Sequence, residues 1–530
     1  MRTATVWQAI QIDFASARER VNPYLDVRVD VAFSGPDGAL VRRPAFWDGD
    51  RIWCVRFTPP AAGTWTFEVS TDDPYDSGLN RASGEIEARV DPGARGVHQH
   101  GFLRAADGGR HLEHADGKPF FWLADTHWRF ATERWDESNK PGWASQFRGT
   151  VDHRAAQGFT VYQCNLMAFG DGWRTSPAWA NGNTFEELDP PWFRNVVDPR
   201  MAYVAEKGLV IALGISWYGG VDENPEGMAR LARYLVARYG AHPMVWTLGG
   251  EVAGYDPELR QQRIDGWRQV ALAIRDADGY DHPRTAHLTC ERPIAPYYQG
   301  DDWLTLTLNQ LGHGDFDLDV SHYADHLDKH PGTPLVEGES MYEGLTTAEY
   351  NGRRSVTATM VRHVAYRAMQ SGCCGYSYGA QGCWNGAWDE QELRSPWGSL
   401  PWYEGVDLPG AVQLGHLRAF YEALNWTALR PAPECLELES WVNETIYRPN
   451  VSADPARSVV VAFFGENYRR PGGRAAFCGL TDSDYRVRLF DPREGSSRTL
   501  VESVAPASGR IELPDLPDEF DWLLVAERIS

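Results

Sequence analysis

The first 95 residues alternate apolar and polar positions, which is the pattern of β-strands with one buried face. The runs YLDVRVDVAFSG, RIWCVRFTPP and GTWTFEVSTDD show this alternation, and turn signals such as PDG and DGD separate them. Helical stretches do not interrupt this segment. We therefore expect a small β-sandwich over residues 1–95, joined to the next domain by a linker near DPGARG.

Residues 96–432 follow a different pattern, in which short apolar runs alternate with helical stretches. The helical stretch MARLARYLVARYG, for example, places Met228, Leu231 and Leu235 on one face. The strand candidates are PFFWLAD, FTVYQCNL, GLVIALGIS, PMVWTLGGE, TAHLTCE, WLTLTLNQ, TPLVEGES and CCGYSYGAQ. Eight β/α repeats predict an α/β fold, a (β/α)8 TIM barrel. A doubly wound sheet is the rival, but it would need a glycine-rich phosphate turn after its first strand, and we find none there.

Strand patterns return in residues 433–530. The runs SVVVAFFG, YRVRLFD and FDWLLVAE again alternate or are continuously apolar, without helical stretches between them. We expect a second β-sandwich here, so that the barrel is flanked by one β-sandwich domain on the N-terminal side and one on the C-terminal side.

The composition narrows the classes of ligand. The 530 residues include 51 Lys and Arg against 73 Asp and Glu, which gives a formal net charge of −22. An acidic protein repels phosphate backbones and anionic membranes, and we find neither a basic stripe nor a run of ~20 apolar residues. The 22 Trp, 22 Tyr and 21 Phe suit neutral sugars, whose C–H faces stack on aromatic rings. We expect a carbohydrate partner, neither nucleic acid nor membrane, and leave homo-oligomerisation open.

Eight cysteines are scattered along the chain without a CxxC pair, which is typical of reduced, mostly buried thiols. The N-terminal stretch has no apolar run long enough for a signal peptide. Together these observations predict a cytoplasmic protein.

Candidate catalytic residues follow from the predicted barrel, because TIM-barrel chemistry takes place at the C-terminal ends of the strands. The fourth strand ends at Glu251, and the seventh ends in EGES, with Glu337 and Glu339. Glycoside hydrolysis needs two carboxylates across such a mouth, one to protonate the leaving oxygen and one to attack or to activate water. A single rim glutamate could equally be a solvated charge, but the pair favours catalysis. Strand alternation puts Glu337 and Glu339 on the same face, so periodicity does not choose between them.

Other polar and aromatic residues at the strand ends are candidates for substrate binding. Candidates for contacts with ring hydroxyls are Asn165, Gln310 and His313, and candidates for subsite recognition are Asp125 and His127. Candidate stacking or wall residues are Trp128, Trp217, Trp384, Tyr342 and Tyr378. Each could equally be a scaffold or core residue, because polar groups also connect barrel loops and a lone Trp is often buried.

Two further patterns are weaker. Residues 375–379 fit the G-x-S-x-G elbow around Ser377, but a glycine-rich loop follows instead of the helix that this elbow requires. Histidines cluster at His98, His100, His111 and His114, before the first barrel strand and without a paired carboxylate or cysteine. We therefore expect no metal site and no cofactor.

Four segments resemble the apiosidase-like glycoside hydrolases: KPFFWLADTHW, LTLNQLGH, PLVEGESMYEG and GYSYGAQGCW. This barrel family is similar to the large clan of retaining glycosidases. In its strand-7 motif the Glu after Gly is the nucleophile, so the resemblance implies that role for Glu339, with Ser340 in place of the usual Pro. It implies the acid/base role for Glu251, where some relatives carry Asp. The N-terminal runs NPYLDVRVDVAF and FTPPAAGTWTFEVS resemble the β-sandwich that precedes such barrels.

The resulting hypothesis is a retaining glycoside hydrolase, exo-acting on oligosaccharides or small glycosides, with Glu339 as nucleophile and Glu251 as acid/base. One alternative is a non-catalytic carbohydrate-binding protein, although a silent barrel would have no use for both glutamates. The other is a serine esterase that acts on decorated sugars through Ser377. The sugar and its linkage are not encoded in these patterns.

Overall fold

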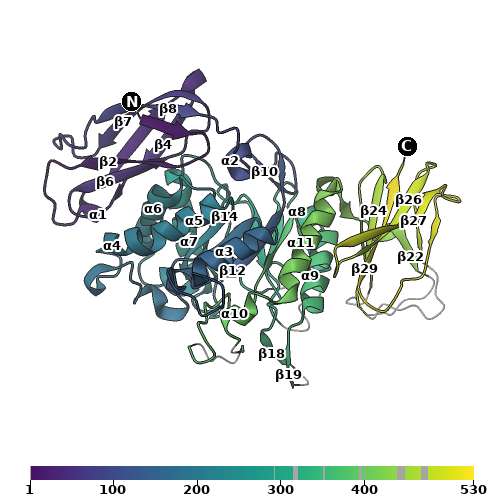
Figure 1. Ribbon diagram of the computed structural model, residues 1–530. Helices are drawn as coiled ribbons and strands as arrows, with labels where there is room; N and C mark the ends of the chain where they lie inside the picture. The colour runs from purple at the N-terminus through teal and green to yellow at the C-terminus, as the bar shows by residue number, and fades with distance from the viewer. Residues whose placement is uncertain are drawn as a thin grey trace.

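A parallel sheet curved into a barrel occupies the centre of the molecule, with two smaller β regions on opposite sides of it (Figure 1). The computed structural model of the protein describes residues 2–291, 293–313, 320–349, 352–392, 397–398, 400–438, 448–466 and 475–529. None of the helices in these ranges is long and apolar enough to cross a membrane.

The central sheet contains seven parallel strands that coincide with seven of the eight predicted ones. Their spatial order is β15-β14-β13-β12-β20-β17-β16. The bounds are β12 (Trp122–His127), β13 (Val161–Asn165), β14 (Val210–Trp217), β15 (Met244–Gly250), β16 (Thr307–Gln310), β17 (Leu335–Glu339) and β20 (Gly375–Tyr378). This order is that of a nearly closed barrel, and it fits the predicted TIM barrel.

The fifth predicted strand, TAHLTCE, is not a continuous strand. Two isolated parallel bridges take its place, from Trp246 to Arg284 and from His287 to Leu308. They connect β15 on one side with β16 on the other and so close the gap in the sheet. The Pro283 carbonyl accepts from the Trp246 amide at 2.9 Å. Because proline lacks an N–H, Pro283 cannot donate a hydrogen bond that would extend the ladder.

Helices cover the outside of the barrel, as the amphipathic stripes predict. Met228, Leu231 and Leu235 are all fully buried on α6. The helices around the barrel are α3 (Gln146–Ala156), α4 (Pro190–Trp192), α5 (Asp198–Glu206), α6 (Pro225–Tyr239), α7 (Arg260–Ala277), α8 (His322–Lys329), α9 (Ala358–Gln370), α10 (Trp402–Gly405) and α11 (Pro409–Glu422). A separate core inside the barrel includes Trp122, Ala124, Val161, Ala212 and Val336.

The N-terminal region consists of two sheets around its own core, which includes Phe33, Val55 and Trp65. One sheet has the order β1 (Arg2–Thr5), β8 (Ser83–Arg89), β7 (Gly63–Thr71), β3 (Val29–Ser34), β4 (Leu40–Pro44). The other has β2 (Ile10–Ala15), β6 (Ile52–Phe57) and β5 (Phe46–Trp47), and short helices α1 (Pro23–Asp26) and α2 (Val97–His100) complete the segment. A three-stranded sheet, β9 (Leu103–Ala105), β10 (Leu112–His114) and β11 (Pro119–Phe120), leads into the barrel.

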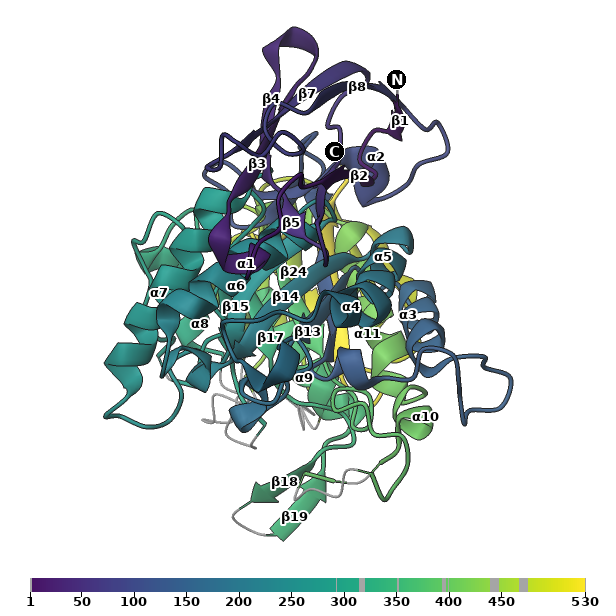
Figure 2. The ribbon, with the colours of Figure 1, turned by 90° about the vertical axis from the view of Figure 1, so that its left-hand side faces the viewer.

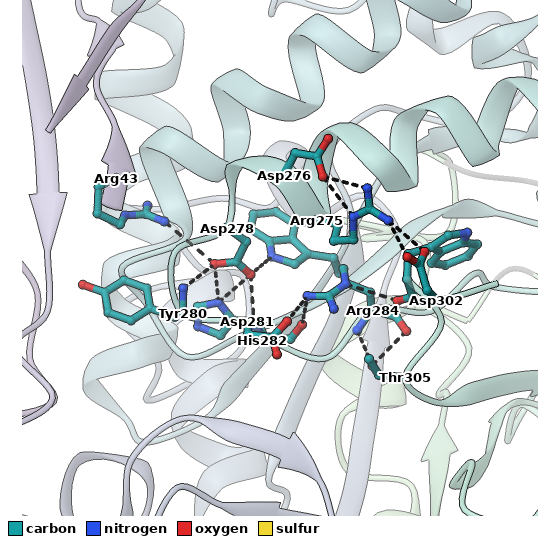
Figure 3. A network of polar contacts seen from close by, with 12 residues as sticks. Arg43, Arg275, Asp276, Asp278, Tyr280, Asp281, His282, Arg284, Asp302 and Thr305 are labelled. Carbon is teal, nitrogen blue, oxygen red and sulfur yellow. Dashed lines mark hydrogen bonds and ion pairs between the residues drawn. The ribbon is translucent and has the colours of Figure 1, made fainter. Parts of the chain in front are cut away.

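A buried arginine attaches the N-terminal region to the barrel (Figure 3). Arg43 on β4 is fully buried, donates to the Val236 carbonyl at 2.7 Å and lies 3.9 Å from Asp278. Asp278 also accepts from His282 and from the Trp246 indole. Since these groups lie at the end of α6 and in the loop before Arg284, the region docks at the N-terminal end of the barrel.

The C-terminal region also consists of two sheets and packs against α9 and α11 (Figure 1). Arg362 on α9 pairs with Asp521 at 2.7 Å, and Tyr366 stacks on Phe463 with centroids 5.3 Å apart. One sheet is β21 (Arg430–Pro431), β23 (Asn450–Ala453), β24 (Val459–Phe464), β29 (Trp522–Arg528), β26 (Tyr485–Asp491), β27 (Ser496–Val504). The other is β22 (Leu436–Leu438), β25 (Ala475–Phe477) and β28 (Ile511–Leu513). A hairpin of β18 (Thr346–Glu349) and β19 (Gly352–Ser355) projects away from the barrel (Figure 2).

Candidate active site

A cavity of about 550 Å³ opens at the C-terminal ends of the barrel strands. Its lining comes from segments that follow all eight strand positions, including Cys290 after the bridged fifth one. Eight of the twelve predicted site residues line it: Trp128, Trp217, Glu251, Gln310, His313, Glu339, Tyr342 and Trp384. The cavity has the size of a site for a small organic ligand.

An irregular register separates the two glutamates of the seventh strand. In the β16–β17 ladder Asn309 pairs with Glu337, but Gln310 pairs with Glu339, so β17 contains one extra residue at Gly338. Such a bulge turns the following side chain to the other face of the strand. The alternation that puts both glutamates on one face is therefore wrong here. A side chain at 338 would come within 2.5 Å of Leu308, which explains the glycine.

Glu337 faces away from the cavity and is fully buried. Its carboxylate accepts from the Tyr323 hydroxyl on α8, from the Asn309 amide at 3.0 Å and from the Leu311 backbone N–H at 3.0 Å. Burial raises the pKa of Glu337 to about 7 despite these donors. Protein hydrogen-bond donors therefore surround this carboxyl group, and it does not face a ligand in the cavity.

Glu339 faces the cavity and is held by two histidines. His287 Nε2 lies 3.0 Å from one carboxylate oxygen, and His313 Nε2 lies 3.1 Å from the other. His313 Nδ1 contacts the Ser340 carbonyl at 2.5 Å, so both of its ring nitrogens face acceptors; these contacts and the charge of Glu339 raise the pKa of His313 against the effect of burial and so favour the imidazolium form. Burial alone would raise the pKa of Glu339, but the two histidines outweigh it and lower this pKa to about 2. Glu339 is thus an anion at every ordinary pH.

Glu251 adopts a left-handed backbone conformation, with φ of 49°, directly after β15. Non-glycine residues rarely adopt it, and such strain is concentrated at functional sites. The Tyr255 hydroxyl donates to its carboxylate, and its backbone N–H donates to His287 Nδ1 at 3.2 Å. Burial and the neighbouring charge of Glu339 raise the pKa of Glu251. His287 thus connects the backbone of one glutamate with the carboxylate of the other, with its proton on Nε2.

The environments of Glu251 and Glu339 push their pKa values in opposite directions. One group is stabilised as an acid and the other as an anion in the same cavity. This is the combination that lets one carboxyl donate a proton while the other acts as an anion.

The two glycines before Glu251 make room for neighbouring protein side chains. A Cβ atom at Gly249 would lie 2.7 Å from the Trp267 ring, and one at Gly250 would lie 2.6 Å from the Trp217 ring. The same atom at Gly250 would lie 2.9 Å from the Asn165 amide nitrogen. The glycines therefore allow Trp217 and Asn165 to fold over the end of β15 beside Glu251.

Ring contacts form a continuous aromatic wall around the cavity. Trp128 contacts Trp217 at 5.6 Å between centroids, Trp217 stacks on Phe169 at 4.2 Å, and Phe169 contacts Trp384 at 5.8 Å. Tyr342 continues the wall from Trp384 at 6.0 Å, and its hydroxyl accepts from the Trp128 indole at 2.9 Å. The wall fixes the rings in place before any ligand binds.

Four predicted site residues do not line the cavity. Asp125 pairs with Arg154 on α3 at 2.5 Å, and His127 bridges Asp125 and Glu133 at 3.2 and 2.9 Å. Burial would lower the pKa of His127, but the two carboxylates raise it to about 9. These residues connect β12 to the helices outside the barrel. Tyr378 likewise donates to the buried carboxylate of Glu343 at 2.7 Å.

Asn165, the fourth, is buried beside the cavity between Gly214 and Gly250. Both polar atoms of its amide lack a hydrogen-bond partner among the described residues, as do the Trp217 indole nitrogen and the Gln310 amide oxygen. Buried polar groups are normally paired, so unpaired ones beside a cavity are positions that a ligand or water can satisfy.

Several residues of the site are missing from the predicted set. Those that line the cavity are Phe169, Tyr255, Cys290, Gly312, Leu345 and Trp397, and His287 supports both glutamates. Tyr255 follows Glu251 by four residues, and His287 lies within the predicted fifth strand, so proximity to a strand end was the available signal for these two. The others lie in loops whose path the sequence pattern does not reveal.

The weaker patterns have structural explanations. Ser377 is fully buried inside the barrel, donates to the Gln163 amide at 2.7 Å and accepts from the Trp122 indole at 3.0 Å, so neither partner is a base. His98 contacts two backbone carbonyls, of Trp7 and Ala205. Within the described ranges no group of three or more His, Cys, Asp or Glu residues is arranged to hold a metal ion.

Comparisons with known proteins agree with this geometry. A family model described as "Apiosidase-like, catalytic domain" matches residues 106–428, more than half of the chain, and one for a domain of unknown function, DUF5060, matches residues 3–72. No curated protein sequence matches the chain.

Solved structures share the fold. One, from Bacteroides vulgatus and provisionally assigned as a glycoside hydrolase, has a TM-score of 0.72 and 14% identity, with 100% of both chains covered. Another, a glycoside hydrolase of family 5 from the same organism, has a TM-score of 0.64 and 18% identity, covering 81% of this chain and 93% of that one. At these identities the likeness concerns the fold.

Proposed function

The chain belongs to the apiosidase-like family of glycoside hydrolases, and from this premise we propose that it is a retaining, exo-acting glycosidase with Glu339 as nucleophile and Glu251 as acid/base. The observation that carries the proposal is the pair of carboxyl groups in one cavity whose pKa values are shifted in opposite directions. The motif-based resemblance to this family is confirmed by the family match.

In the first step the Glu339 carboxylate attacks the anomeric carbon, and the bond from that carbon to the leaving oxygen breaks. The proton of Glu251 moves to the leaving oxygen, so the alcohol departs neutral and a glycosyl ester remains on Glu339. Ionised Glu339 and protonated Glu251 are the states that their surroundings favour. His287 and His313 keep the attacking carboxylate in place.

In the second step a water molecule attacks the anomeric carbon of the ester. Glu251, now a carboxylate, takes the proton of the water, and the bond to Glu339 breaks. Both groups return to their starting states, and two inversions give net retention. The Tyr255 hydroxyl, which donates to Glu251, stabilises its anionic form between the two steps.

The size of the cavity, about 550 Å³, supports action on a short glycoside, and we propose that the terminal sugar of such a glycoside is released. We propose that hydroxyl groups of the terminal sugar pair with the unpaired polar atoms of Asn165, Trp217 and Gln310. The aromatic wall would stack against the C–H face of the ring.

Further parts of the proposal concern the rest of the chain. We propose that the two-sheet regions are β-sandwiches, with domains over residues 1–95, 96–432 and 433–530. All eight cysteines are free, which supports a reducing compartment such as the cytoplasm. The chemistry needs no cofactor, because two carboxyl groups and water supply every proton and bond.

A panel of 4-nitrophenyl α- and β-glycosides of pentoses and hexoses, furanosides included, tests the proposal. We expect the wild type to hydrolyse one member of the panel. NMR during the reaction should show that the sugar released first has the same anomeric configuration as the substrate. Glu339→Ala should lose at least 10⁴-fold in kcat, on the order seen when a covalent nucleophile is removed. Azide should rescue it with a glycosyl azide of inverted configuration.

Glu337→Gln is the matched control, because it changes a neighbouring glutamate that does not face the cavity. It should keep activity within about tenfold while Glu339→Ala is inactive. Activity retained by Glu339→Ala, or first release of the inverted anomer, would contradict the mechanism. Glu251→Ala should hydrolyse activated 4-nitrophenyl substrates far better than unactivated methyl glycosides, because only the latter need the acid.

A further inference from the structure

Three aromatic residues that line the cavity are exposed to solvent. We call Phe169, Tyr255 and Trp397, which are 38%, 58% and 43% exposed, its aromatic rim. Among the described residues, two other large aromatic residues are exposed, Tyr75 and Phe520. Three of five exposed aromatic rings therefore lie around one cavity, and such clustering marks a binding surface.

Two rings of the rim are fixed on the side of Glu251. Phe169 stacks on Trp217, whose own ring covers Gly250, the residue before Glu251. The Tyr255 hydroxyl donates to the Glu251 carboxylate, while Tyr255 as a whole stays 58% exposed. On the other side of the cavity, Trp397 contacts the ring of His313, which holds Glu339. Because Glu251 is the group that protonates the leaving oxygen, Phe169 and Tyr255 lie on the leaving-group side.

The rim offers little to a polar leaving group. Apart from the rim, the aromatic wall and the polar residues Glu251, Gln310, His313 and Glu339, the lining residues are Cys290, Gly312 and Leu345. The Tyr255 hydroxyl already donates to Glu251, and that of Tyr342 accepts from Trp128. Within the lining that the structure describes, the rim therefore offers the hydroxyl groups of a second sugar few hydrogen-bond partners. A flat apolar group needs no such partners and gains ring contacts.

We propose that Phe169 and Tyr255 form a leaving-group subsite for a planar, apolar aglycone, so that the substrates are aryl glycosides of phenol type. The inference rests on the proposed function, because a leaving-group side exists only if Glu251 is the acid. It narrows the substrate class from any short glycoside to those whose sugar is attached to an aromatic ring.

The test compares leaving groups with and without a ring on the sugar that the panel identifies. The measured quantity is the ratio of kcat/KM for the 4-nitrophenyl glycoside to kcat/KM for the glycosyl fluoride. Phe169→Ala should lower this ratio about 3- to 10-fold, the range for one aromatic contact. Phe169→Tyr should restore it. Tyr75→Ala, which removes an exposed ring elsewhere, should leave the ratio unchanged.

Non-hydrolysed inhibitors separate binding from chemistry. The phenyl 1-thioglycoside should inhibit the wild type at least tenfold more tightly than the methyl 1-thioglycoside, and Phe169→Ala should remove most of that difference. Tighter inhibition by a 1-thio-linked disaccharide than by the phenyl compound would overturn the inference, as would an unchanged ratio in Phe169→Ala. Hydrolysis of neither substrate class by the wild type would instead refute the proposed function, and this inference with it.

Discussion

Replacement of His313 by glutamine should move the acidic limb of the pH profile upward. The imidazolium of His313 lies 3.1 Å from Glu339 and favours its anionic form. Glutamine can still donate a hydrogen bond but carries no charge. The pKa of Glu339 must therefore rise, and activity, which needs the anion, must be lost at a higher pH as the solution is acidified.

The size of this shift follows from the two histidines. Together they lower the pKa of Glu339 from 4.5 to about 2 against the effect of burial. That lowering of the pKa corresponds to about 3 kcal/mol. If His313 supplies half, its loss raises the pKa by more than about one unit, because burial then acts with less opposition. We expect the limb of His313→Gln between about pH 3.5 and 5.

The measurement is kcat/KM from pH 2.5 to 9 on the hydrolysed aryl glycoside, with circular dichroism at each pH to show that the protein is folded. In the wild type we expect no acidic limb above the pH of acid unfolding, because Glu339 stays an anion there, whereas the rate should fall at higher pH as Glu251 loses its proton. His100→Gln is the control, since His100 is half-buried in the linker and pairs with Asp116 at 2.7 Å. A uniform loss of rate in His313→Gln, with no displaced limb, would refute the electrostatic role.

Three further variants test other parts of the structure. The pKa of His127 is raised to about 9, so the charged ring stabilises the fold fully below pH 6.5, and this stabilisation is lost as the pH rises through 9. The melting temperature of the wild type should therefore fall over that range. It should change much less in His127→Gln. Gly250→Ala should lower kcat/KM at least tenfold, because its Cβ atom would displace Trp217, whereas Gly93→Ala at the surface should not. Arg43→Met should destabilise the fold by about 3 kcal/mol in urea unfolding, because a buried aspartate loses its partner, and should keep kcat/KM within about twofold.

The barrel was predictable because its strands and helices follow from hydrophobic patterns among residues that are close in sequence. Strands buried on both faces read as short apolar runs, and helices that cover them carry one apolar stripe, as Met228, Leu231 and Leu235 show. The bridged fifth strand was less predictable. Its backbone pairs depend on Pro283, which has no N–H, and on partners on β15 and β16 that are distant in sequence.

The position of the site was also predictable, but the direction of each side chain was not. Asp125 and His127 share one face of β12, and Thr126 and Trp128 share the other. The sequence shows this alternation without showing which face meets the cavity, and the structure turns Trp128 inward and Asp125 toward α3. Tyr255 and Phe169 reach the site through loops, whose path depends on contacts such as that of Phe169 with Trp217.

The extra residue at Gly338 has an evolutionary consequence. In an unbroken strand, residues two apart share one environment, so a substitution that suits one constrains the other. At the bulge, Glu337 and Glu339 enter separate environments, one buried against α8 and the other open to the cavity. If Glu339 is the nucleophile, as we propose, mutations that adapt its surroundings to a new sugar can therefore accumulate without disturbing the buried acid two positions earlier. The face of the strand that meets the cavity can therefore change in sequence, while close packing keeps the buried face constant.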